Sequence, residues 1–407
     1  MNRTGPRFPQ AHDLPAWKAW QRRQQPLIRR AKATVTPQQS RVVHIHHDGA
    51  PVHTLVALES LGPTQRAAIL APLKYLRPTS GVAYVVSTEV SQMIIRGMVR
   101  GEPAEAQLPT RARVVDVYRT RSRVPSVLRS VRSVVAVGNY LPAGAQAYCW
   151  ARAVGAQFVV VQHGLLAYQA PPLPEDAHLL AFTPEDAAWW SAGRQDVVSD
   201  VVGSQLLWGA SHRPPEPSAE NKDTRRGTAH QKNSPGVFLG QMHGAELPRK
   251  DFFCAAASYC QETGAAYRPH PAEQDRLSRL LHAVLRRRGI DVVPNDNALD
   301  RTEGAVTAVF STGVLEAAAA GRRSWVFHPN PPDWLQDFWQ RYGMSRWLPG
   351  ETADPTPAPR CPAMEPARAI ARLLFAPEEW RADADTTDRD CADTPRRRDD
   401  AACQGDT

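Results

Sequence analysis

No stretch of this sequence is apolar enough to cross a bilayer, and cysteine is scarce. The apolar runs fall far short of the about eighteen residues that a spanning helix needs. The basic N-terminus also lacks the apolar segment of a secretory signal, so we expect a cytoplasmic protein. The six cysteines form no CxxC pair and no zinc-like spacing with the 13 histidines, among which there is no HExxH. We therefore expect free thiols in a reducing compartment and no metal site.

Acidic residues are nearly missing from the first 41 positions. Asp13 stands there against nine lysines and arginines, and the whole chain has a net charge of +8. Such an excess favours a polyanionic surface, for example the inner face of a membrane. A solvated arm of arginine-rich composition is the alternative. A second arginine cluster lies between residues 111 and 132. Because no nucleic-acid-binding motif accompanies the charge, we expect no specific nucleic-acid partner.

Short β-branched runs alternate with helical stretches along most of the chain. This pattern predicts βαβ units and a mostly parallel sheet in each of two domains, and 407 residues suit two domains with tails. We therefore expect an α/β fold of two Rossmann-like domains that face a cleft, since the carboxyl ends of such strands bind ligands. The expected segments are a basic flexible arm (1–40), a first domain (41–210), a flexible linker (211–235), a second domain (236–350), a C-terminal helix region (351–377) and a disordered tail (378–407).

The stretch at 305–321 reads AVTAVFSTGVLEAAAAG. An apolar run, a Ser-Thr-Gly turn and an alanine-rich segment predict a strand, a turn and a helix that ends at the last glycine. Ser311 and Thr312 then lie with Gly313 at a helix N-terminus, whose N–H groups and positive dipole can bind phosphate. A plain capped connection would give the same pattern. Glu316, about one turn further on, either accepts from a ribose hydroxyl or complements the helix dipole.

A second motif follows the apolar strand predicted at 157–161. Gln162-His163-Gly164 stands where an open α/β sheet binds its ligands. The glycine would allow a sharp turn, and a histidine with a pKa near neutrality can act as a general base toward an incoming hydroxyl. A polar residue that merely ends a strand is the alternative. Asn139 also follows a predicted strand of this domain and could face the same acceptor.

A third motif, YRPHP, ends with His270 and Pro271. The prolines on either side fix the backbone around His270, which can stabilise charge on a leaving phosphate. Arg268 adds a permanent cation that pairs with phosphate. A proline-rich surface loop is the alternative. A weaker candidate, Gly240-Gln241, follows the first strand of the second domain, where the glycine allows a ligand to approach closely or simply makes a turn.

In their order, the motifs QHG, RPHP and STGVLEAAAAG resemble those of bacterial GT-B transferases that use cytidine-nucleotide donors. These are the CDP-glycerol glycerophosphotransferases of teichoic acid synthesis, the capsule Kdo transferases and the polysialyltransferases. Their second domain holds the donor nucleotide with a His-Pro and a Ser/Thr motif. Their first-domain motif is His-Gly in the teichoic acid enzymes and Gln-x-Gly in the Kdo transferases, and QHG fits both. The acidic motif of the polysialyltransferases is missing, which disfavours sialic acid transfer, and no catalytic carboxylate is identifiable.

The resemblance implies an inverting, metal-independent transfer of a sugar or polyol phosphate from a CMP- or CDP-linked donor. The acceptor would be a cell-envelope polysaccharide or a lipid-linked primer, bound by the first domain, and no cofactor beyond the donor is expected. His163 would deprotonate or orient the acceptor hydroxyl, His270 would stabilise the leaving phosphate, and the basic arm would hold the enzyme at the inner membrane face. A UDP-sugar epimerase of the same fold and a non-enzymatic polyanion-binding protein are the alternatives. The donor-binding residues are then Arg268, Pro271, Ser311, Thr312, Gly313, Glu316, Gly240 and Gln241, and the acceptor-side residues are Gln162, Gly164 and Asn139.

Overall fold

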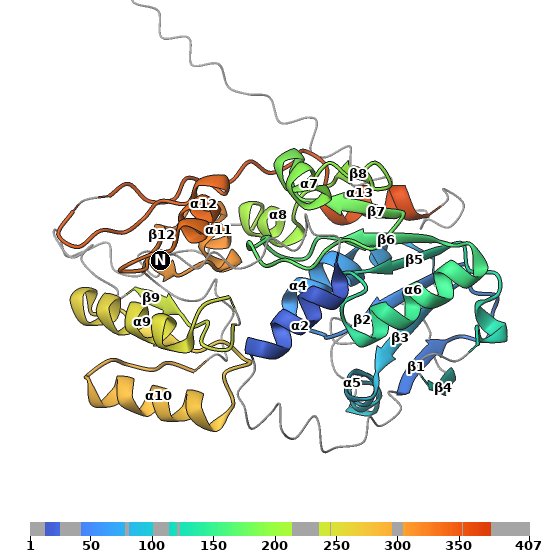
Figure 1. Ribbon diagram of the computed structural model, residues 1–407, viewed down its shortest axis with the longest axis horizontal. Coiled ribbons are helices and arrows are strands. Elements are labelled where there is room, and N and C mark those ends of the chain that lie inside the picture. The colour runs from blue at the N-terminus through green and yellow to red at the C-terminus, as the bar shows by residue number, and fades with distance from the viewer. Residues whose placement is uncertain are drawn as a thin grey trace, which may run out of the picture.

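The computed structural model shows two α/β halves that lie side by side (Figure 1). It describes residues 13–24, 42–77, 81–100, 114–119, 123–213, 236–244, 246–294, 304–351 and 353–375. An eight-stranded sheet forms the centre of the first half and a four-stranded sheet the centre of the second. Within the described residues, no helix combines the length and the apolar character needed to span a membrane.

The sheet of the first half is mostly parallel, and its order is β4-β1-β3-β2-β5-β6-β7-β8. β1 (Val42–His47) runs antiparallel to both of its neighbours. β2 (Thr54–Leu58), which is not among the predicted strands, is buried along its whole length, as parallel strands covered on both faces are. The remaining strands are β3 (Val82–Ser87), β4 (Val114–Arg119), β5 (Ser133–Ala136), β6 (Gln157–Val161), β7 (Ala177–Ala181) and β8 (Val198–Val201).

Helices cover both faces of this sheet. Alternate residues of a strand point to opposite faces, so Val56 and Leu58 join one apolar core while Leu55 and Ala57 join another. Pro72 lies in the helical stretch after β2 and interrupts it, because proline cannot donate within an α-helix. That stretch consists of α4 (Pro63–Gln65), a π-helical turn (Arg66–Leu70) and a 3₁₀ helix (Ala71–Tyr75). The other helices include α5 (Thr88–Arg100), α6 (Pro142–Val154), α7 (Pro184–Ser191) and α8 (Gln205–Ser211).

The sheet of the second half has the Rossmann strand order. Its four parallel strands lie in the order β10-β9-β11-β12, and parallel bridges at Val292 and Arg346 add one position at each edge. Numbered along the chain, the six positions read 3-2-1-4-5-6. The predicted α/β fold with two Rossmann-like halves is thus confirmed. The elements are β9 (Val237–Leu239), α9 (Arg249–Thr263), β10 (Ala266–Arg268), α10 (Arg276–Arg287), β11 (Val306–Ala308), α11 (Thr312–Ala319), β12 (Ser324–Val326) and α12 (Asp333–Arg341).

The chain returns to the first half at its C-terminal end. α13 (Pro366–Leu374) lies over the first half in Figure 1, and Ala367 and Ile370 enter the same core as Val56 and Leu58. In the other direction, α8 at the end of the first half packs against α11 of the second. The helix region expected at 351–377 therefore completes the first half, although it follows the second in sequence.

Part of the predicted basic arm is a docked helix, α2 (Leu14–Gln24). Trp17 is buried, its indole N–H donates to the carbonyl of Gln169 at 2.7 Å, and its ring meets Tyr140 edge-on at 5.3 Å. One large aromatic side chain thus anchors this helix of the expected arm to the first half. The other residues of the expected arm, 214–235 of the expected linker and the expected tail lie outside the described residues.

Candidate functional site

The strand order places the best ligand-binding positions at two switch points. In the first half, successive strands continue from β2 in opposite directions, so the loops after β2 and β5 diverge at the carboxyl edge of the sheet. In the second half, the loops after β9 and β11 do the same. Residues that follow these strands are therefore the ones to compare with the sequence prediction.

The Ser-Thr-Gly turn begins α11, as predicted. Ser311 is the N-cap, and its hydroxyl accepts a hydrogen bond from the backbone N–H of Gly313 at 3.2 Å. That hydroxyl thus satisfies one of the helix's own unpaired donors. Ser311 and Thr312 are half-buried while Gly313 is buried. The helix N-terminus keeps its positive dipole toward the carboxyl edge of the sheet.

The loop after β9 is bonded to the loop after β11. The Gln241 side-chain oxygen accepts from the backbone N–H of Phe310 at 3.0 Å. Gly240 is a close-approach position, since a Cβ there would lie 2.3 Å from the Tyr267 hydroxyl oxygen. Gly240 therefore serves packing against β10, and Gln241 brings the loop beside the N-terminus of α11.

Two exposed histidines stack on each other at the carboxyl ends of β9 and β10. The rings of His243 and His270 have centroids 3.9 Å apart and planes 19° apart. The Nδ1 atom of His270 accepts from the backbone N–H of Ala272 at 3.1 Å, so a neutral ring carries its proton on Nε2. Desolvation, and for His243 also the neighbouring His270, lowers the pKa of both rings, that of His243 to about 4. The pair thus offers an N–H donor, and a bound anion would favour the protonated form of both rings.

A buried carboxylate holds this histidine pair in place. Glu273 accepts from the backbone N–H of Met242 at 2.9 Å, from the Tyr267 hydroxyl at 2.8 Å, and contacts His282 Nε2 at 2.8 Å. Its side chain is completely buried. Because Met242 precedes His243 and Glu273 follows His270 by three residues, one side chain fixes both histidine-bearing loops.

The remaining predicted donor residues differ in their exposure. Arg268 is buried at the end of β10, and its carbonyl accepts from Gly240 N–H at 2.7 Å. Pro271 is exposed beside His270. Glu316 is half-buried on α11, where burial raises the pKa of its carboxyl group and the nearby Arg213 partly offsets this. Its ribose contact remains a prediction.

In the first half, Gln162 holds the turn that carries His163. Gln162 is fully buried; its side-chain oxygen accepts from Phe182 N–H at 2.8 Å, and its Nε2 donates to Asp186 at 2.8 Å and to the Gly164 carbonyl at 3.0 Å. Because its amide is bonded to these three protein groups, Gln162 has a positioning role. Gly164 has no positive φ, and a Cβ there would meet nothing within 4 Å. The turn therefore makes no use of the conformations that only glycine adopts, and the Gln162 side chain holds it.

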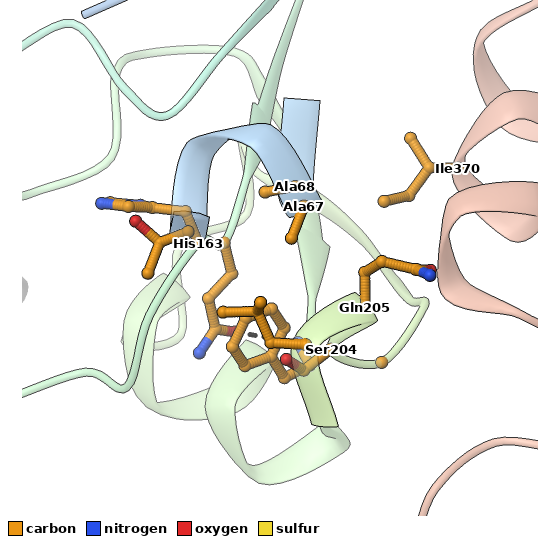
Figure 2. Close-up of a pocket in the computed structure, with 11 residues that line it drawn as sticks. Ala67, Ala68, His163, Ser204, Gln205 and Ile370 are labelled. Carbon is orange, nitrogen blue, oxygen red and sulfur yellow. Dashed lines mark hydrogen bonds between the residues drawn. The ribbon is translucent and has the colours of Figure 1, made fainter. Parts of the chain in front are cut away.

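His163 lines a small pocket between the first-half loops and α13. His163 and Ile370 lie on opposite sides of it, with Ala67, Ser204 and Gln205 between them (Figure 2). Burial lowers the pKa of His163 to about 4. The ring is therefore neutral at neutral pH and a weak base by itself. A negative group brought by a substrate would raise that pKa.

The switch point of the first half carries two further polar groups. Asn139 follows β5, and its side-chain oxygen is buried without a hydrogen-bond partner among the described residues. Glu59 directly follows β2, and its carboxylate accepts from Gly144 N–H in the first turn of α6 at 2.8 Å. Glu59 was missed because β2 was not predicted; a carboxylate directly after a five-residue apolar run was the available signal. His243 was missed because only the glycine and glutamine of its loop drew attention.

The loop that follows β6 also contacts the second half. The Tyr342 hydroxyl donates to Asp186 at 2.7 Å and accepts from Leu166 N–H at 2.8 Å. Arg341 donates to the Leu166 carbonyl and lies 4.1 Å from the centroid of the Trp189 ring. Asp186, which also accepts from Gln162, is fully buried, and burial raises the pKa of its carboxyl group. The position of the His163 turn is thus linked to the second half through two side chains.

No group of three or more His, Cys, Asp or Glu side chains is arranged to hold a metal ion in the part of the chain that the structure describes. The chain matches no protein-family model, and the curated proteins contain no match to it. Among solved structures, a glycosyltransferase from Rickettsia africae ESF-5 is similar over 80% of this chain and 88% of that chain, with 11% sequence identity and a TM-score of 0.39. A likeness at this TM-score supports no statement about the site or its chemistry.

Proposed function

We propose that this protein transfers a sugar or polyol phosphate from a nucleotide-activated donor, in an inverting reaction that needs no metal ion. The observation that carries the proposal is the exposed His243–His270 stack beside the N-terminus of α11, at the switch point of the second half. Rossmann-like sheets bind nucleotides at this position. The nucleotide donor would thus bind to the second half of the chain.

The donor phosphate would lie between the histidine stack and the start of α11. His270 Nε2–H and the helix N-terminus supply fixed donors toward the leaving phosphate, which is the work that a metal ion performs in other transferases. The motif resemblance favours a cytidine nucleotide, and Glu316 would then face the ribose. A phosphate beside His243 and His270 would also raise their depressed pKa values.

The acceptor would bind at the carboxyl edge of the first-half sheet. The acceptor oxygen forms the new bond while the bond to the nucleotide phosphate breaks, and the acceptor proton passes to a base of the first half. His163 and Glu59 are the titratable groups there that follow β6 and β2. We propose a cell-envelope polysaccharide or a lipid-linked primer as the acceptor.

A thermal-shift series with CMP, CDP, UMP, UDP, GDP and ADP tests the donor site. A ligand that binds the folded state alone raises the melting temperature by mass action, and we expect selective stabilisation by CMP or CDP. Selective stabilisation by UDP, with turnover in the absence of any acceptor, would replace the transferase by an epimerase. If none of the six nucleotides shifts the melting temperature, the proposal is wrong.

Variants assign the nucleotide site to the histidine stack. His270→Asn and His243→Asn should each weaken nucleotide binding roughly ten-fold or more, since each removes a charge-assisted contact to phosphate. Titration calorimetry measures the loss. His178→Asn is the matched control. His178 pairs with Asp200 near the start of β7, so it lies toward the amino ends of the first-half strands, whereas the candidate site residues follow the carboxyl ends. Unchanged affinity in both stack variants would contradict the phosphate role.

A further inference from the structure

Helix α10 presents an apolar and basic face to solvent. Leu277 is 47% exposed and Leu280 is 58% exposed, and their spacing of three places them on one side of the helix. The opposite side is buried through Ser278, His282 and Leu285. Figure 1 shows α10 as the outermost helix of the second half, away from the first. Exposed leucines at adjacent turns of one helix need an explanation other than core packing.

Arg276 and Arg287 are the exposed arginines on the same side of the helix as these leucines, and no acidic residue lies within the helix. The side chains at 276, 279, 286 and 287 are exposed arginines. Arg288 follows directly, 5.3 Å from the centroid of the Phe253 ring. The nearest acid, Asp275, caps the helix and is already paired with Arg249 at 2.8 Å. The helix therefore carries a positive charge that no acid within Arg276–Arg287 offsets.

We propose that α10 binds the surface of an anionic phospholipid bilayer. Leu277 and Leu280 would enter the interface between headgroups and acyl chains, and the arginines on the same side would bind lipid phosphates. A soluble polyanion would satisfy the arginines but would provide no apolar phase for the leucines. The observed combination of groups thus favours a bilayer.

The position of α10 relates this contact to the candidate donor site. The YRPHP loop leads directly into the helix, since His270 lies five residues before the Asp275 cap. A helix bound at the membrane would therefore keep the donor loop beside the bilayer, where a lipid-linked acceptor is found; this consequence rests on the proposed function, whereas the contact itself does not. The contact is also distinct from one through the basic arm.

Sedimentation of the full chain with vesicles tests the proposal. We expect binding to vesicles of phosphatidylcholine and phosphatidylglycerol, and at least about ten-fold weaker binding to phosphatidylcholine alone. Leu277→Gln with Leu280→Gln should reduce binding to the anionic vesicles by about ten-fold or more. Arg276→Gln with Arg287→Gln should reduce it similarly at low salt.

Matched controls separate α10 from the rest of the surface. Leu373→Gln removes a leucine of α13 that is 44% exposed, and Arg22→Gln with Arg23→Gln removes exposed arginines of α2. Both controls should bind vesicles like the unmodified chain. An unchanged nucleotide thermal shift in the α10 variants would show that they are folded, and this readout is independent of vesicle binding.

Three results would overturn the proposal. The first is failure of the unmodified chain to bind anionic vesicles. The second is loss of binding in the α2 variant with full binding in both α10 variants, which would assign the contact to the arm. The third is binding that depends on the α10 arginines but not on the leucines and is equally strong to soluble polyphosphate, which would identify a polyanion-binding surface.

Discussion

At the scale of single residues, Glu273 determines the geometry of the candidate donor site. Its carboxylate joins β10, α10 and the loop after β9 through Tyr267, His282 and Met242. A buried charge is tolerated there because each oxygen has a partner. The stacked histidines at the surface therefore depend on a side chain that no solvent or ligand reaches.

Glu273→Gln tests this dependence. An amide has one acceptor oxygen in place of two and adds two N–H donors, so at least one of the present partners loses its bond. We expect unfolding in urea to show a loss of about 2 to 4 kcal/mol in stability, together with weaker nucleotide binding. Glu262→Gln, at an exposed position of α9, should leave both unchanged. Wild-type stability of the Glu273 variant would contradict the role of the carboxylate.

Sequence reasoning located several positions at this scale but not the bonds that define them. His270 and Ser311 stand at strand ends, as their flanking apolar runs predict. The partners of Gln162, in contrast, are Phe182, directly after β7, and Asp186 in α7. Short polar contacts between segments twenty residues apart leave no pattern in the sequence, so its positioning role could not be predicted.

At the scale of elements, α13 is the clearest case of a helix held by tertiary contacts. It has nine residues, too few for stability in isolation, and its apolar side enters the first-half core through Ala367, Ile370 and Ala371. The helix was predictable from its periodicity. Its position on the first half was not, because periodicity shows that a helix has an apolar side but not which surface covers it.

Ile370→Ala should destabilise the first half. Ile370 is 2% exposed, and truncation of a buried isoleucine to alanine costs about 2 to 5 kcal/mol. Thermal or urea unfolding followed by tryptophan fluorescence measures the change. Leu373→Ala, on the exposed side of the same helix, should change stability by less than about 1 kcal/mol. Equal effects of the two variants would show that α13 is not packed as described.

The missed strand β2 has a physical explanation at the same scale. Thr54–Leu58 is buried on both faces, so all five positions are apolar or small and no alternation marks it as a strand. Strands with one open face, such as an edge strand, keep alternation. The central strands of a parallel sheet, which position the site, are thus the least periodic part of the sequence.

At the scale of the whole molecule, the contact between the two halves includes a polar link, besides the packing of α8 against α11. Tyr342 of the second half bonds to Asp186 and to Leu166 N–H of the first, and Asp186 in turn holds Gln162. The contact lies beside the turn that carries His163. Movement between the halves would therefore displace the turn that carries His163.

Tyr342→Phe should release this contact. The variant keeps the ring and removes both hydrogen bonds of the hydroxyl, so the Leu166 amide loses its acceptor and should exchange its hydrogen faster, by about ten-fold or more. Hydrogen exchange followed by mass spectrometry of peptides across 162–168 measures this. Tyr148→Phe is the control, because its hydroxyl bonds within the first half, to the Glu175 carbonyl. Unaltered exchange at Leu166 would mean that the hydroxyl does not hold the halves together.

The chain passes between the halves at α8 and again before α13, and these two passages are fastened to each other. The Gln205 amide donates to Glu365 at 2.7 Å and accepts from Ala367 N–H at 2.8 Å, while Lys74 and Tyr75 also donate to Glu365. The places where the chain leaves the first half and returns to it are thus bonded directly to each other. Because Gln205 also lines the pocket of His163, a displacement of this junction would change the wall of that pocket.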